Sequence, residues 1–177
     1  MRWLLACVLA VSTSTVQADG PLYAEVQLAA AGVNHSNLDF YPSFGSISAG
    51  LFVREGIGIE VFADSGITSD KKNGFDLEVT EAYGIGLRLQ SAPVRRIQGY
   101  MVLGAVNFTV NQEANATASL SGSLINGDFT GMRVSLGIME RLERWNNVLV
   151  SLEYRHYNAD QPIHVDALLL GLRVNTP

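Results

Sequence analysis

The sequence feature that most constrains the fold of this chain is a long alternation of side-chain types over residues 99–111, GYMVLGAVNFTVN. Side chains of an extended strand point alternately to opposite faces, so Tyr100, Val102, Val106 and Phe108 share one face. Strands of soluble proteins commonly have about 5–6 residues. Strands that cross a membrane have about 9–11, with one apolar face and aromatic residues near its ends. The stretch therefore predicts a transmembrane β-strand.

The two faces of this strand differ in polarity, and the difference predicts how the strand faces. We expect the face that carries Tyr100, Val102 and Val106 to contact lipid, with Val106 near the midplane. The opposite face becomes polar along its length, so we expect Asn107 and Asn111 to face the lumen or its mouth.

The composition of the chain agrees with dispersed apolar strands. The 177 residues are 47% hydrophobic and only 16% charged. After the first few residues, no run approaches the roughly 18 consecutive apolar residues of a transmembrane helix. The net charge of −5 leaves no basic footprint for nucleic acid, so we expect no nucleic-acid partner.

The amino-terminal residues 1–18 predict a signal peptide. Arg2 supplies the positive charge, an apolar segment follows it, and Val16 and Ala18 are small residues before the expected cleavage site. Residues 19–177 then form one domain. Cleavage also removes Cys7, the one cysteine, which excludes disulfides and cysteine chemistry in the mature chain.

The alternation recurs along the mature chain and predicts eight strands. We place them at residues 22–30, 46–54, 57–64, 77–90, 99–111, 132–138, 148–157 and 167–175. Long connections at 32–44, 68–74, 112–128 and 158–162 alternate with short turns. Long external loops and short periplasmic turns are typical of bacterial outer-membrane barrels. We therefore predict an all-β, eight-stranded antiparallel up-and-down transmembrane barrel in the bacterial outer membrane, with both termini in the periplasm.

The less apolar faces of the strands carry acidic and basic residues in near balance. These residues are Glu25, Glu60, Glu78, Glu153, Arg54, Arg88, Arg133, Arg155 and Arg173. A soluble lipocalin-type barrel would turn its apolar face inward, but the long aliphatic faces favour the membrane. Side chains fill the interior of a small eight-stranded barrel, so we expect these charges to pair as a polar plug. A narrow channel is the alternative.

Several segments resemble the small outer membrane β-barrel family that includes OmpA and OmpX, within the porin superfamily. The resemblance lies in Tyr100, Gly104 and Phe108 of the fifth strand, and in residues 152–157 and 170–174. It implies insertion by the barrel-insertion machinery and an environment of outer membrane lipid and lipopolysaccharide. Members of this family usually end in an aromatic residue, whereas this sequence ends in Thr176 and Pro177.

The chain has three histidines, His35, His156 and His164, whose spacing matches no metal site. Lipid A deacylase barrels have a similar strand count and carry a His-x-Ser pair with a nearby acid. Here Asn158 stands in the serine position after His156. The adjacent His35 and Ser36 would point to opposite faces of a strand, so neither pair forms a nucleophile and its base.

We therefore assign no catalytic, cofactor-binding or metal residues. The expected function is that of a non-enzymatic, monomeric outer membrane protein with a structural or surface-interaction role. A surface ligand would bind through the loops at residues 32–44 and 112–128. A lipid A-modifying, deacylase-like enzyme and a narrow channel remain the alternatives.

Overall fold

The computed structural model describes residues 22–35, 38–72, 75–114, 126–145, 147–159 and 164–176, and these residues form ten β-strands. The strands are β1 (Leu22–His35), β2 (Leu38–Phe40), β3 (Ser43–Arg54), β4 (Ile57–Thr68), β5 (Asp70–Lys72), β6 (Phe75–Gln90), β7 (Ile97–Ala114), β8 (Asn126–Arg141), β9 (Val148–Ala159) and β10 (His164–Asn175). No helix long and apolar enough to cross a membrane occurs in these ranges. The predicted signal peptide, residues 1–18, lies outside them.

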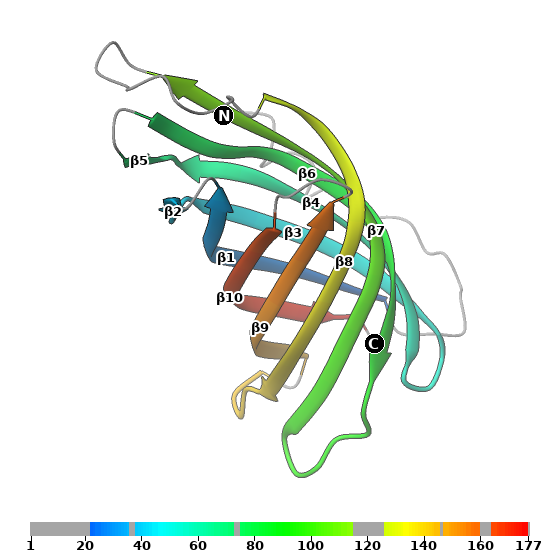
Figure 1. The fold of residues 1–177 in the computed structure, drawn as a ribbon. Coiled ribbons are helices and arrows are strands. Elements are labelled where there is room, and N and C mark those ends of the chain that lie inside the picture. Colours follow the sequence, from blue (N-terminus) through cyan, green and yellow to red (C-terminus); the bar gives the residue numbers. More distant parts are fainter. Residues whose placement is uncertain are drawn as a thin grey trace.

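The eight long strands close into an antiparallel barrel, as predicted (Figure 1). Each strand pairs with its neighbours in the order β10-β9-β8-β7-β6-β4-β3-β1, and β10 pairs again with β1. The closing pair places Leu28 opposite Leu170 and continues for most of both strands. Closure leaves the long strands without a free edge, so the ladder satisfies the backbone hydrogen bonds of each strand on both sides.

The strands continue further at one end of the barrel than the sequence predicts. β1 runs to His35, and its last residues, the short β2 and the start of β3 together occupy most of the predicted loop at 32–44. β7 continues to Ala114 and β8 begins at Asn126, so strands take up both ends of the predicted 112–128 loop. Hairpin pairing can extend past an apolar belt because the backbone ladder does not depend on side-chain polarity. Residues 115–125 lie outside the described part of the chain.

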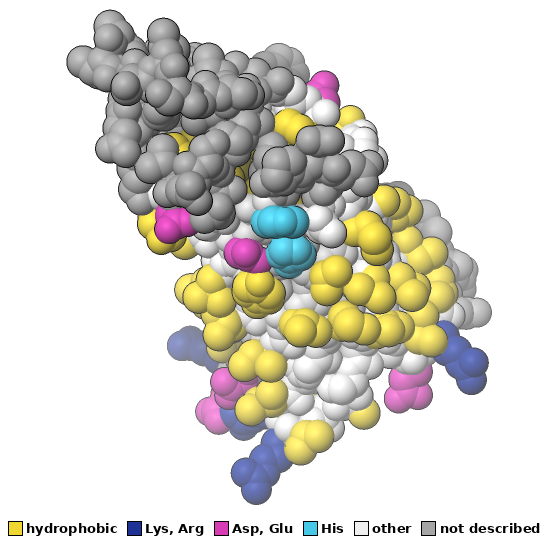
Figure 2. All heavy atoms as spheres, viewed as in Figure 1, with side chains coloured by type: hydrophobic (Ala, Val, Ile, Leu, Met, Phe, Trp, Pro, Cys, Tyr) yellow, Lys and Arg dark blue, Asp and Glu magenta, His cyan; other side chains and the backbone are white. Residues whose placement is uncertain are grey.

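The outward faces of most strands match the prediction. On β1, β3, β4, β8, β9 and β10 the predicted apolar faces point outward, and Leu28 and Leu170 are 66% and 61% exposed. Figure 2 shows this surface as a band of hydrophobic side chains, and the basic side chains visible in this view lie toward one end of the molecule. The outward apolar belt is what a barrel in lipid requires.

The predicted facing of the fifth strand, now β7, is wrong. Val106 is 2% exposed and Tyr100, Val102 and Phe108 are also buried inside the barrel, whereas Leu103 points outward. Both faces of this strand are apolar over residues 100–105, so polarity alone could not tell which face points into the barrel.

Space inside the barrel resolves the ambiguity of β7. Its register places Tyr100 opposite Gly137, and a Cβ added to Gly137 would lie 2.3 Å from the Tyr100 ring. The aromatic side chain therefore occupies the room that glycine leaves in the lumen. Asn107, predicted to face the lumen, is instead on the outward face, where it accepts a hydrogen bond from Thr130 (2.6 Å).

The predicted face of β6 is also wrong near the start of the strand. A β-bulge between Val79 and Glu81 shifts the alternation by one residue. Leu77 and Val79 are consequently buried in the interior, while Ile85 on the same predicted face is exposed. Glu81, which interrupts the apolar alternation in the sequence, marks the place of this bulge.

The corrected facing of β7 predicts a depth-dependent effect of charge. Leu103→Arg should lower the free energy of unfolding by about 2–4 kcal/mol, because it places a cation on the outward face near the membrane centre. Asn107→Arg, on the same face but closer to the boundary of the apolar belt, should cost only about 0–1 kcal/mol. Urea unfolding of the barrel in lipid vesicles measures both values. Equal losses for the two variants would contradict this facing.

Candidate functional site

The interior of the barrel holds a buried network of equal numbers of arginines and carboxylates. Its charged members are Arg88, Arg133, Arg155, Arg173, Glu25, Glu60, Asp64 and Glu153. All eight side chains are 5% exposed or less, and they come from β1, β4, β6, β8, β9 and β10. Buried ions need partners, so their mutual geometry decides what the interior can do.

Glu153 on β9 is the most heavily bonded carboxylate of the network. It accepts hydrogen bonds from Arg155 Nε (2.7 Å), Arg133 Nη2 (3.1 Å) and the Tyr100 hydroxyl (2.8 Å). Gln27 Nε2 donates a further bond of 3.2 Å. Tyr100 is therefore a member of the polar network, although its place in an apolar alternation predicted a lipid contact.

Glu60 on β4 occupies a second junction of the network. Arg88 Nη1 lies 2.7 Å from one of its oxygens and Arg133 Nη2 lies 3.2 Å from the other. The Tyr23 hydroxyl donates a hydrogen bond of 2.6 Å to the same carboxylate. Arg133 thus bridges Glu60 and Glu153 and joins the two junctions.

Asp64 and Arg155 form the junction nearest the end of the barrel opposite the termini. Arg155 Nη1 lies 3.0 Å from Asp64, and the Tyr157 hydroxyl also donates to this carboxylate. Arg155 Nη2 donates to Gln27 Oε1 at 2.7 Å. Asp64 lies on the face predicted to be inward, but the prediction did not include it in the charge set.

Three residues that were predicted to belong to the inward charge set do not form ion pairs in this network. Arg54 is exposed at the end of β3, and Glu78 is only half-buried and is not one of the buried charged residues. Arg173 is buried as predicted, but no described carboxylate pairs with it. Its guanidinium instead lies 3.7 Å from the centre of the Tyr23 ring and donates to Gln90 Oε1 at 3.1 Å. A cation–π contact substitutes for the ion pair.

Apolar side chains lie on both sides of the charged network along the barrel axis. One buried cluster contains Phe40, Phe44, Phe108 and Leu169, and a smaller one contains Tyr100, Val102, Met139 and Leu149. Side chains therefore fill the interior above and below the paired charges. This arrangement supports the expected plug and disfavours a water-filled path.

A second polar group lies on the outer surface, at the border of the apolar belt. His156 Nδ1 is 2.7 Å from Asp166 Oδ1, and the Tyr154 hydroxyl donates to the same oxygen at 2.5 Å. The rings of His156 and His164 stack with centroids 5.8 Å apart. Figure 2 shows histidine side chains beside an acidic one just beyond the hydrophobic band. We call Tyr154, His156, His164 and Asp166 the histidine cluster.

The histidine cluster supplies part of the deacylase pattern and lacks another part. Asp166 is an acid that hydrogen-bonds His156, a contact that the sequence analysis missed because it depends on the register between β9 and β10. Asn158 is exposed two residues along the same face as His156, and an amide is not a nucleophile. The side chain of His35 lies outside the described structure. No group of three His, Cys, Asp or Glu side chains that could hold a metal occurs among the described residues.

The two ends of the barrel differ in charge. The end opposite the termini carries the acidic residues Asp39, Asp70, Asp76, Glu78, Glu81 and Asp128. We call these six residues the acidic rim. Lys71 pairs with Asp76 at 3.0 Å, and hydrogen bonds from Ser69 and Lys71 hold the pKa of Asp76 below its usual value. The end that carries the termini has the exposed arginines Arg54, Arg95, Arg96, Arg141 and Arg144 at its turns.

Comparisons with known proteins agree with this architecture. Residues 3–175 match the family model of the outer membrane protein beta-barrel domain. No curated protein sequence matches this chain.

Three solved structures share the fold at low sequence identity. Ail of Yersinia pestis, in complex with the heparin analogue sucrose octasulfate, has a TM-score of 0.63 at 13% identity, covering 90% of this chain and 100% of its own. Neisserial surface protein A has a TM-score of 0.64 at 19% identity, covering 88% and 99%. The N-terminal barrel of Pseudomonas aeruginosa OprF has a TM-score of 0.56 at 12% identity, covering 86% and 97%.

The buried network predicts a large penalty for removing one charge. Arg155→Met should lower the free energy of unfolding by about 3–5 kcal/mol, because it leaves Asp64 and Glu153 with fewer partners in a buried site. Arg54→Met removes an exposed arginine and should change stability by less than about 0.5 kcal/mol. Urea unfolding in lipid vesicles measures the free energy of unfolding of both variants. Similar stabilities for the two variants would show that the interior charges are not coupled.

Proposed function

This chain belongs to the outer membrane protein beta-barrel domain family, and we propose that it acts at the bacterial surface as a non-enzymatic interaction protein. It is a small barrel of the bacterial outer membrane, and the lipid of that membrane surrounds it. We propose in addition that residues 1–18 are removed as a signal peptide and that the barrel works as a monomer.

The charge at the two ends supports an orientation for the barrel. We propose that the termini and the arginine-bearing turns are periplasmic, so that the acidic rim faces the exterior. An even number of strands brings both termini to the same side, and short turns on that side are typical of the periplasmic end. The 32–44 and 112–128 regions then lie at the outer end.

The acidic rim is the observation that carries the interaction proposal. Carboxylates at the outer end attract cations and repel polyanions over about 8 Å at physiological salt. The partner that this surface supports is therefore a cationic group on a peptide, a polymer or a neighbouring envelope component. A sulfated ligand like the one bound to Ail would meet repulsion from the rim of this chain.

Charge reversal on intact cells tests both the orientation and the partner class. Cells that display the protein should bind more of a fluorescent lysine-rich peptide than cells that lack it. The Asp76→Lys, Asp128→Lys double variant should reduce this excess strongly, because it reverses two charges of the acidic rim. The matched double variant Glu140→Lys, Glu143→Lys lies at the other end and should leave the excess unchanged. Loss of binding in the second variant alone would contradict the orientation.

A lipid A deacylase is the second candidate, because Asp166 and His156 form the hydrogen-bonded acid and base that such an enzyme needs. We expect no activity, since Asn158 provides no nucleophilic oxygen. The purified barrel is incubated with lipopolysaccharide, and the mass of lipid A is then measured by mass spectrometry. We expect no loss of an acyl chain. Release by the unaltered protein would establish the enzyme instead. The filled interior disfavours the channel alternative.

A further inference from the structure

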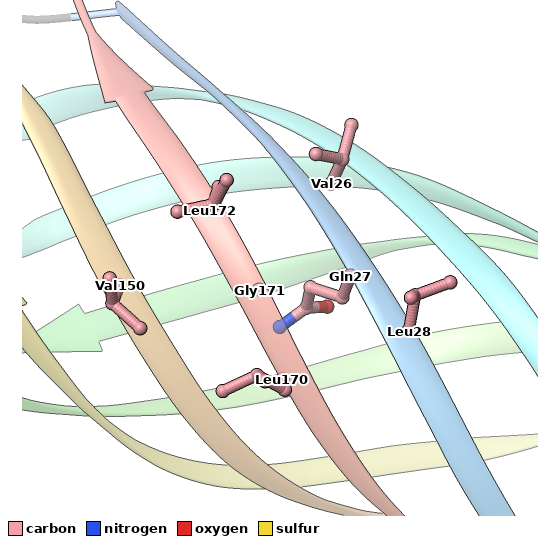
Figure 3. A pocket seen from close by; sticks show the side chains of 7 residues that line it. All are labelled: Val26, Gln27, Leu28, Val150, Leu170, Gly171 and Leu172. Atoms are coloured by element: carbon pink, nitrogen blue, oxygen red, sulfur yellow. The ribbon is translucent and has the colours of Figure 1, made fainter.

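A groove crosses the outer surface where β1 and β10 close the barrel. Figure 3 shows the outward side chains that form its walls, which are Val26, Leu28, Val150, Leu170 and Leu172. All five are apolar, and in an outer membrane barrel they face the hydrocarbon of the lipid. The groove therefore offers no hydrogen bond to a polar ligand. Unmatched polar groups occur instead inside the barrel, at the end that carries the termini.

Arg173 is a buried cation with no carboxylate beside it. It lies two residues before the end of β10, and its side chain is fully buried. The four carboxylates of the interior pair with the other three buried arginines. The neighbour of Arg173 is a second cation, because Arg173 Nη1 and Arg88 Nη2 contact the same Met139 Sδ at 3.4 and 3.3 Å. Among the described residues, no side chain in contact with Arg173 neutralises its charge.

The polar side chains around Arg173 have their oxygens in use and their N–H groups left over. Arg173 Nε donates to Asn175 Oδ1 at 2.8 Å, and Nη1 donates to Gln90 Oε1 at 3.1 Å. Gln90 Nε2 donates in turn to Gln98 Oε1 at 3.2 Å. Arg173 Nη2 is buried and has no hydrogen-bond partner among the described residues. We call Gln90, Gln98, Arg173 and Asn175 the arginine–amide group.

The turns at this end of the barrel add positive charge around the arginine–amide group. They carry the five exposed arginines described above, which outnumber the exposed acidic residues of the same turns, Glu55, Glu140 and Glu143. Backbone hydrogen bonds join neighbouring turns, from Gln90 N to Gly56 O at 2.8 Å and from Arg141 N to Arg96 O at 3.0 Å. Charge of one sign around a narrow opening raises the local concentration of counter-ions. This end of the barrel therefore favours an anion.

We propose that the arginine–amide group binds one monatomic anion, a halide such as chloride, at Arg173 Nη2. A site whose unmatched groups are all donors takes a ligand that only accepts. Carboxylates and phosphates bind arginine through two parallel N–H bonds. Here Nε and Nη1 are already engaged by Asn175, Gln90 and Met139, so neither edge of the guanidinium can provide such a pair. A single-atom acceptor needs only Nη2.

Chloride binding to the purified full chain in detergent tests this site. The chloride NMR line of a sodium chloride solution should broaden when the barrel is added, and sodium bromide should reverse the broadening at lower concentration than sodium acetate. Gln90→Glu gives Arg173 a carboxylate partner of the same size, and Arg173→Gln removes the cation. Each should reduce chloride affinity at least about tenfold. Lys71→Gln, which removes a cation at the other end, should leave the affinity unchanged.

Three results would overturn the proposal. The first is a chloride line that the unaltered barrel does not broaden. The second is full broadening by a folded Gln90→Glu or Arg173→Gln variant, because chloride would then bind only the exposed arginines; a mobility shift between boiled and unboiled samples shows that a variant has folded. The third is displacement by acetate at lower concentration than by bromide. None of these results depends on the orientation of the barrel, so each would leave the surface role standing.

Discussion

Backbone hydrogen bonding in hydrocarbon is the constraint on which the rest of this structure depends. A strand in lipid has no water to satisfy its N–H and C=O groups, so every strand must have two neighbours. The pairing of β1 with β10 completes that requirement and turns an open sheet into a barrel. Once the sheet is closed, alternate side chains must enter a narrow interior. The outward face is then free to be apolar, and the inward face has to fill a fixed volume.

The interior meets this requirement with side chains of opposite charge and with aromatic rings. Arg133 joins Glu60 to Glu153, while Tyr23 and Tyr100 donate hydroxyl bonds to the same two carboxylates. Glycines make room for the rings, as Gly137 does for Tyr100. Removing Arg133 or Arg155 leaves buried carboxylates with fewer partners. The network therefore holds the strands in one register, in addition to whatever stability it contributes.

Much of this architecture follows from sequence alternation, and the errors have a common cause. Alternation predicts the eight strands and the inward charges Glu25, Glu60, Arg88 and Arg155, because polar and apolar faces differ clearly on their strands. It fails for Val106, whose strand is apolar on both faces, so that the space beside glycine on neighbouring strands decides. It also fails for Leu77, because a bulge inserts one residue into the period. Glu81 was the visible sign of that bulge.

The outer surface shows why the candidate sites were harder to predict than the fold. His156 and Asp166 are ten residues apart, and their contact exists only because β9 and β10 pair in one register. A slip of one residue would turn one of them to the interior. The groove likewise combines β1 with β10, the two ends of the domain, and no local pattern relates them. Function on this scaffold thus arises where closure brings distant segments together. Alternation within a single strand indicates which face contacts lipid. It carries no information about contacts between residues on different strands.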